Sequence, residues 1–522
     1  MLEYLVNQFD EFDYFCYFFR HYTLISKQWN TEILPKLRIV DYYIVIFDKT
    51  DPLDIQILSN LTNRFKLKYR ISIGACNLKI YNLKDKVHHV RLCQDFITAS
   101  DLETLSNYKY LKKIKLSQFS PFTDRGCEVL SNFASSNKGI KLSLDGVGNT
   151  DKPIISCLFN LNILHSLIFS NDVIPNDTVF QLNGISKLNL TSIYSQLDTI
   201  CRLFENTPNL EKLCLFDNSL EEGQYFDDVL KKITHLQQLK ELLLGVSDSC
   251  NFQSIVYLLN NVKSVNTDVT FHMVHYESVE DVLSSKINNS NIHTFDFSSP
   301  LKFTPETDEL NNFNLLSIWD DKSHLQHICV KRKKDLLVDL PTSIYSLKTN
   351  YTLNKNVVSE TYSSLLEVLI DNRLINLTEI NIDDLRATDM KIILNSQIPK
   401  LTIVKVQFLN DQNGLNQDLI QTIQNNHTVT NLFIFHLSWY KLYSFYETAI
   451  QVLKVNNTLV SLYLPYYKND EVTQQYIDSF KEIIINNHTI RRIYIPLSDS
   501  KSPKLLLDLF RLFNRYSISR NT

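Results

Sequence analysis

The chain has 522 residues, a net charge of −4 at neutral pH and an apolar fraction of 44%. This balance is ordinary for a folded protein, and so small a net charge gives no broad attraction to nucleic acid or anionic membranes. Glycine is scarce, with 9 residues, and the sequence contains neither G-x-x-x-x-G-K-[ST] nor G-x-G-x-x-G. Because phosphate-binding loops use glycine to bring backbone N–H groups to the ligand, the composition argues against a nucleotide-dependent enzyme.

The cysteines and the first residues indicate a compartment. The nine cysteines are scattered, odd in number and never arranged as C-x-x-C, which is typical of reduced, intracellular proteins. The opening segment, "MLEYLVNQFDEFDYF", carries acidic residues where a signal or transit peptide would carry basic ones. The sequence also lacks a run of about 18 apolar residues. We therefore expect a cytoplasmic protein with no membrane partner.

Residues 1–40 predict a small helical segment, with aromatic and aliphatic residues at helical spacing before the helix-ending Pro35. One interpretation is a cap that covers the end of a repeat array. Alternatively, "LISKQWN" resembles the closing half of an F-box, although the opening L-P of that module is absent. The resemblance implies that Leu24, Ile25 and Trp29 contact the adaptor of a cullin-RING ubiquitin ligase, with the chain as substrate receptor.

The next 200 residues predict strands at increasingly regular intervals. Strand-like runs at 38–47, 68–81 and 87–92 are expected to begin the sheet. From 160 to 250 a pattern L-x-x-L-x-L recurs, most completely in "LEKLCLFDN", where Leu210, Leu213 and Leu215 precede Asn218. The pattern fades over 260–350. The basic run Lys331 to Lys334 follows, and it predicts either a nuclear-localisation or acidic-partner contact or a solvated loop.

The clearest repeat lies between 375 and 496. The apolar pattern starts at 377, 401, 429, 459 and 490, with helical spacing in the intervals at 417–424, 446–455 and 474–485. The phrase "NNHT" or "NNT" stands between helix and strand three times, which predicts a helix end with Asn as the left-handed C-cap residue. An apolar helix is expected at 505–513.

This pattern resembles the leucine-rich repeat family, specifically its helix-containing ribonuclease-inhibitor-like type. The resemblance implies an α/β fold, a curved solenoid with a concave parallel sheet and helices on its convex side. The solenoid would span residues 41–500, irregular at 41–160 and 260–350, with helical caps at 1–40 and 501–522.

The concave face is the predicted binding surface, since the residue between the second and third apolar anchors points away from the core. In the last five repeats these residues are Asn381, Lys405, Phe433, Tyr463 and Tyr494. Large aromatics with a cation nearby are typical of binding hot spots. The predicted partner-binding set is Phe433, Phe435, Tyr463, Tyr466, Arg492 and Tyr494. The alternatives are that the C-terminal tail covers these rings, or that they are ordinary surface aromatics.

The sequence nominates no catalytic residue, cofactor or metal ligand. It contains no H-E-x-x-H, no G-x-S-x-G and no paired-cysteine zinc motif. We therefore expect non-catalytic protein binding through the repeat face, without nucleic acid. Two alternatives stay open, namely the ubiquitin-ligase receptor described above and a regulator of a small GTPase, the latter by analogy of fold alone.

Overall fold

The structure is a computed structural model of the chain. It describes residues 26–28, 31–32, 38–47, 56, 68–74, 89–93, 104–108, 111–117, 124–147, 152–220, 225–297, 301–310, 313–330, 340–349, 374–396, 398–408, 416–436, 444–464, 472–494, 503–516 and 518. The chain divides into two compact units, residues 1–264 and 265–522, so the predicted array of residues 41–500 is distributed over both.

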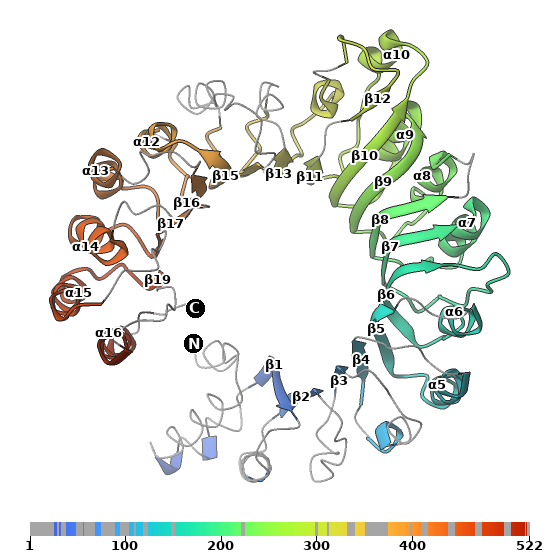
Figure 1. Cartoon of the computed structure of the whole chain (residues 1–522), viewed down its shortest axis with the longest axis horizontal. Coiled ribbons are helices and arrows are strands. Elements are labelled where there is room, and N and C mark those ends of the chain that lie inside the picture. Colours follow the sequence, from blue (N-terminus) through green and yellow to red (C-terminus); the bar gives the residue numbers. More distant parts are fainter. Residues whose placement is uncertain are drawn as a thin grey trace. The chain divides into compact units, whose positions relative to one another are not determined.

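The first unit alternates strands and helices around a parallel sheet. Strands β3 to β9 pair in chain order, and Figure 1 shows helices α5 to α9 along one face of them. The strands are β3 (His89–Cys93), β4 (Lys113–Ser117), β5 (Lys141–Val147), β6 (Leu164–Val173), β7 (Lys187–Ser195), β8 (Lys212–Leu220) and β9 (Glu241–Asn251). The helices are α5 (Asp124–Ser136), α6 (Lys152–Phe159), α7 (Leu197–Glu205), α8 (Asp227–Ile233) and α9 (Phe252–Asn261).

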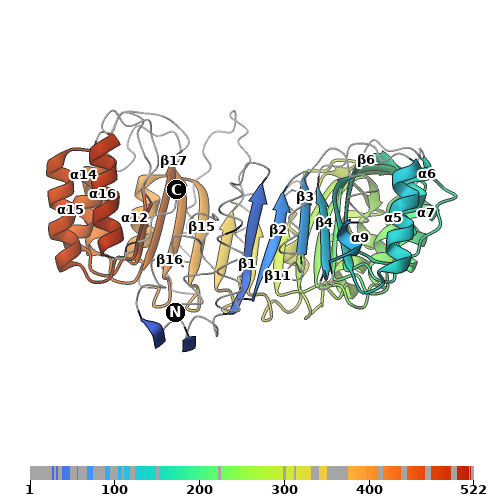
Figure 2. The same ribbon diagram turned by 90° about the horizontal axis from the view of Figure 1, so that it is seen from below.

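Strands β1 (Arg38–Phe47) and β2 (Lys68–Gly74) pair in parallel as a two-stranded sheet of their own. The sequence predicts that they begin the main sheet. Figure 2 shows them next in order before β3 and β4, but the hydrogen-bonded pairing described for the larger sheet begins with β3 and β4.

The second unit repeats the same plan. Its strands are β10 (Asn266–His275), β11 (Thr294–Phe297), β12 (Phe303–Thr304), β13 (His327–Val330), β14 (Ser346–Thr349), β15 (Glu379–Leu385), β16 (Ile403–Phe408), β17 (Asn431–His436), β18 (Ser461–Tyr463) and β19 (Arg492–Tyr494). Its helices are α10 (Val279–Ser284), the short 3-10 helix η4 (Leu315–Ile318), α12 (Ala387–Asn395), α13 (Gln417–Asn425), α14 (Phe445–Val455), α15 (Gln474–Asn486) and α16 (Pro503–Arg515).

The core of each unit lies between the sheet and its helices. In β16 the burial alternates residue by residue, with Val404 and Val406 fully buried and Lys405 between them half-buried. The five repeat starts read from the sequence, 377, 401, 429, 459 and 490, are all buried and precede β15 to β19. Residues 260–350, where the sequence pattern fades, also contain strands of the sheet. Phe295 and Phe297 of β11 and Ile328 of β13 are buried at the equivalent core positions.

Helix ends in the second unit are fixed by side chains. Asn416, Ser444 and Thr473 each accept a hydrogen bond from a backbone N–H in the first turn of α13, α14 and α15. In the middle of α15, Phe480 packs edge to face on Phe513 of α16, with ring centroids 5.4 Å apart. The predicted C-terminal helix therefore exists and packs on α15, and Figure 1 shows it next to α15 in the row of helices.

The repeated asparagines end helices differently from the prediction. Asn426, Asn456 and Asn487 have φ of −77°, −80° and −96°, so the expected left-handed conformation is wrong. They are buried and connect neighbouring repeats. The amide nitrogen of Asn456 donates to the carbonyls of Ile423 and Asn426, both at 2.8 Å, and its Oδ1 accepts from two backbone amides of its own repeat.

Asn426 and Asn487 repeat this arrangement. The side chain of Asn487 donates to the carbonyls of Leu453, at 3.1 Å, and Asn456, at 2.8 Å. That of Asn426 donates to the carbonyl of Leu394. We name these three residues the asparagine ladder. The phrase recurs because each copy joins its helix end to the preceding repeat.

Candidate binding face

One row of residues runs across the second unit on the sheet face opposite the core. Each member directly follows a buried residue of its strand, so the alternation of a strand points it away from the helices. The strand register pairs the members one after another. In order from β10 to β19 they are Asp268, Asp296, Cys329, Lys348, Asn381, Lys405, Phe433, Tyr463 and Tyr494. We call this sheet side the open face.

The C-terminal end of the row is a connected group of aromatic rings. The ring of Tyr463 lies 5.6 Å from that of Tyr494 and 4.8 Å from that of Phe435, measured between centroids. Phe433 meets Tyr494 edge to face at 5.6 Å. Phe435 is 38% exposed, and the other three rings are half-buried. We call Phe433, Phe435, Tyr463 and Tyr494 the aromatic ladder.

Cations border the aromatic ladder on both sides. The Lys405 ammonium lies 5.8 Å from the centre of the Phe433 ring and 2.7 Å from a carboxylate oxygen of Glu379. Arg492 is exposed at the start of β19, two residues before Tyr494, so both side chains lie on the open face. Rings and cations in this arrangement suit an apolar or aromatic side chain next to a carboxylate.

The opposite end of the row is acidic. Burial, and then the neighbouring Asp296 charge, raise the pKa of Asp268 to about 7, while Lys348 opposes the shift. Burial also raises the pKa of Asp296, against the hydrogen bond from Cys329 and the charge of Lys348. Sequence reasoning missed these residues. The signal was available, since Asp296 and Cys329 stand between apolar positions in "IHTFDF" and "LQHICV".

The structure brings together Phe433, Phe435, Tyr463 and Tyr494 from the predicted partner-binding set, with Arg492 on the same face. Tyr466 lies outside the described residues. So do Leu24, Ile25 and Trp29 of the predicted adaptor-binding segment, and the basic run Lys331 to Lys334.

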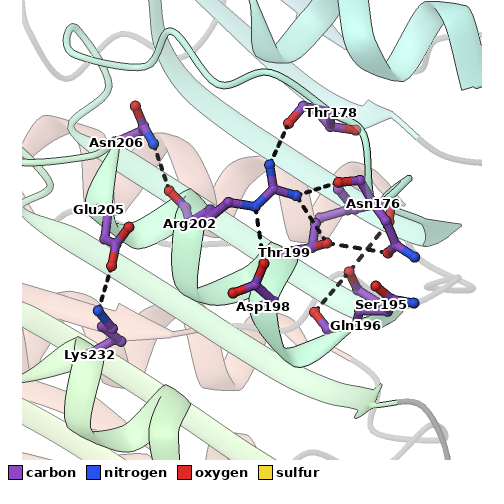
Figure 3. Close-up of polar contacts among 11 residues, drawn as sticks. Asn176, Thr178, Ser195, Gln196, Asp198, Thr199, Arg202, Glu205, Asn206 and Lys232 are labelled. Carbon is purple, nitrogen blue, oxygen red and sulfur yellow. Dashed lines mark hydrogen bonds and ion pairs between the residues drawn. The ribbon is translucent and has the colours of Figure 1, made fainter.

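A dense polar cluster on the helical side is structural. The Arg202 guanidinium of α7 donates to the carbonyls of Asn176 and Thr178, the second at 3.4 Å, and lies 3.6 Å from the Asp198 carboxylate (Figure 3). It also lies 5.9 Å from the centre of the Phe180 ring. These contacts tie the segment after β6 to α7, on the helical side of the first unit's sheet.

Comparison of the sequence with protein-family models and with curated proteins gives no match. Within the described ranges no helix has the length and apolar character that crossing a membrane requires. In the same ranges no three His, Cys, Asp or Glu side chains are grouped so as to hold a metal ion.

Proposed function

We propose that both units are built of leucine-rich repeats of the ribonuclease-inhibitor-like type, and that the chain binds a protein partner through the open face without catalysis. The unit of one strand and one helix supports the repeat assignment. So does Asn218, whose buried side chain donates to the carbonyl of Leu190 at 3.1 Å and accepts from the amide of Ile193 at 2.9 Å. A repeat that bonds its predecessor in this way cannot complete its structure alone.

The observation that carries the binding proposal is the aromatic ladder itself. Its rings come from three neighbouring repeats, contact one another and retain solvent exposure on a sheet face whose backbone groups are already paired. Folding alone gains little by placing aromatics there, because the core positions of the same strands are filled by Leu432, Leu462 and Ile493. Tyr and Arg dominate binding energy where they occur in protein interfaces.

The partner chemistry follows from the surroundings of the ladder. An apolar or aromatic anchor of the partner would stack on Phe435 and Tyr463, and a carboxylate beside it would meet Arg492. Lys405 is already paired with Glu379, so it would orient the Phe433 ring more than attract the partner.

The test is affinity capture from cell lysate followed by measurement of the binding constant for each captured protein. Tyr463→Ala/Tyr494→Ala should weaken the interaction by at least about 30-fold, corresponding to about 2 kcal/mol for a hot spot. The matched control is Tyr194→Ala/Tyr257→Ala, which removes two exposed tyrosines of the first unit. If both double variants bind every partner as the unmodified chain does, the ladder is not the binding site.

A further inference from the structure

In the first unit, the sheet face opposite the helices carries lysines, and we call it the open face of that unit. Lys113 and Lys141 are directly opposite each other on β4 and β5, and Lys187 lies opposite Lys212 on β7 and β8. Each precedes a buried core leucine or isoleucine, so each points to the side away from the helices. Lys141 and Lys187 are exposed and Lys113 is half-buried.

Two lysines at the edges of this group are already neutralised. Lys115 forms an ion pair with Asp145, and Lys212 forms one with Glu241 at 2.5 Å. In the part of the chain that the structure describes, Lys113, Lys141 and Lys187 form no ion pair with a carboxylate. We call these three residues the lysine patch.

The lysine patch concentrates positive charge. Burial lowers the pKa of Lys113, and the charges of Lys187, Lys115 and Lys141 add to that effect, opposed by Asp145. His165, at the start of β6 between the lysines, also has a lowered pKa, through burial and then through Lys141 and Lys113. These groups lie within one another's field, so an anion on this face would relieve their repulsion.

The chemistry of the anion follows from the remaining side chains. The strand neighbours of the patch on this face include Ser143, Ser166 and Asn189, whose hydroxyl and amide groups can bond to a peptide backbone, and His165 contributes one ring beside the lysines. An extended peptide places every second side chain on one side, about 6.7 Å apart. Neighbouring strands lie about 4.8 Å apart, so flexible lysine side chains on β4, β5 and β7 can reach carboxylates at that spacing.

We propose that the lysine patch is a second docking surface, separate from the aromatic ladder, that binds an extended acidic segment of a protein. Its attraction is electrostatic, so binding should weaken as salt screens the charges. The proposal does not depend on the ladder, because the two surfaces lie in different units.

The probe is a fluorescein-labelled peptide of about eight residues that alternates Glu and Ala, titrated with the full chain and followed by fluorescence anisotropy. Lys141→Glu/Lys187→Glu should weaken peptide binding at least about tenfold, and raising the salt from about 0.05 M to about 0.3 M should weaken binding to the unmodified chain. The control Lys263→Glu/Lys504→Glu makes the same charge change at two exposed lysines outside the patch and should bind within about twofold.

A peptide with Gln in place of Glu, and a single-stranded oligonucleotide of equal charge, complete the experiment. The proposal is overturned if the Gln peptide binds as well as the Glu peptide, if the control variant loses as much affinity as the patch variant, or if the oligonucleotide binds more tightly through the same lysines. Tyr463→Ala/Tyr494→Ala should leave peptide binding unchanged, so failure of one surface is distinguishable from failure of the other.

Discussion

The asparagine ladder makes a sharp prediction about stability, because adjacent residues of the same type differ completely in environment. Asn456 is 1% exposed and makes four hydrogen bonds, whereas Asn457 is exposed. Asn456→Ala removes the acceptor for the amides of Thr458, at 2.8 Å, and Leu459, at 2.9 Å. A buried donor left without a partner costs about 1–3 kcal/mol, so we expect a total loss of about 3 kcal/mol.

The assay is urea unfolding followed by far-UV circular dichroism, with hydrogen exchange at the amides of Thr458 and Leu459 as the local measurement. Asn457→Ala should change stability by less than about 0.5 kcal/mol. Asn456→Asp keeps the shape but turns a carboxylate oxygen toward the carbonyls of Ile423 and Asn426, so it should destabilise at least as much as alanine. Equal stability of the Asn456 and Asn457 alanine variants would refute the hydrogen-bonded ladder between repeats.

Two further predictions concern the second unit. Leu462 is a 1% exposed core residue, so Leu462→Ala should lower the free energy of unfolding by about 2–5 kcal/mol through the cavity it leaves. Leu462→Met should lower it by less than about 1.5 kcal/mol. If both variants melt at the same temperature as the unmodified chain, the strand register is contradicted. Asp268 has a pKa of about 7 in the folded chain against 3.8 ordinarily. Between these two values the folded state keeps a proton that the unfolded chain loses, so the free energy of unfolding falls as the pH rises from 3.8 to about 7. Because the carboxyl is partly solvated, Asp268→Asn should gain about 1–2 kcal/mol relative to the unmodified chain between pH 5 and pH 8, and a pH-independent difference would contradict the raised pKa.

The repeat and its open face could be predicted from sequence because both rest on local periodicity. The alternation in "VKVQF" and "LFIF" places Lys405 and Phe433 opposite the core without any knowledge of their neighbours. Their contact follows from the register of β16 and β17, which similar anchors in consecutive repeats impose.

The errors arose where partners come from another repeat. The left-handed C-cap expected for Asn456 considers the helix end alone. In the structure its side-chain nitrogen donates to the carbonyl of Asn426 in the preceding repeat, and its Oδ1 accepts from the backbone amide of Leu459 in its own repeat. Similarly, Asp268 and Asp296 align only once β10 and β11 are paired.

The most direct test of the proposed binding face is photo-crosslinking in cells from position 435. Replacement of Phe435, the most exposed ring of the ladder, by p-benzoylphenylalanine should give a discrete covalent adduct with a partner protein that Tyr463→Ala/Tyr494→Ala abolishes. The same probe at Tyr257, which is 44% exposed on α9, should give no such adduct. An adduct formed equally from both positions, or from neither, would contradict protein binding through the aromatic ladder.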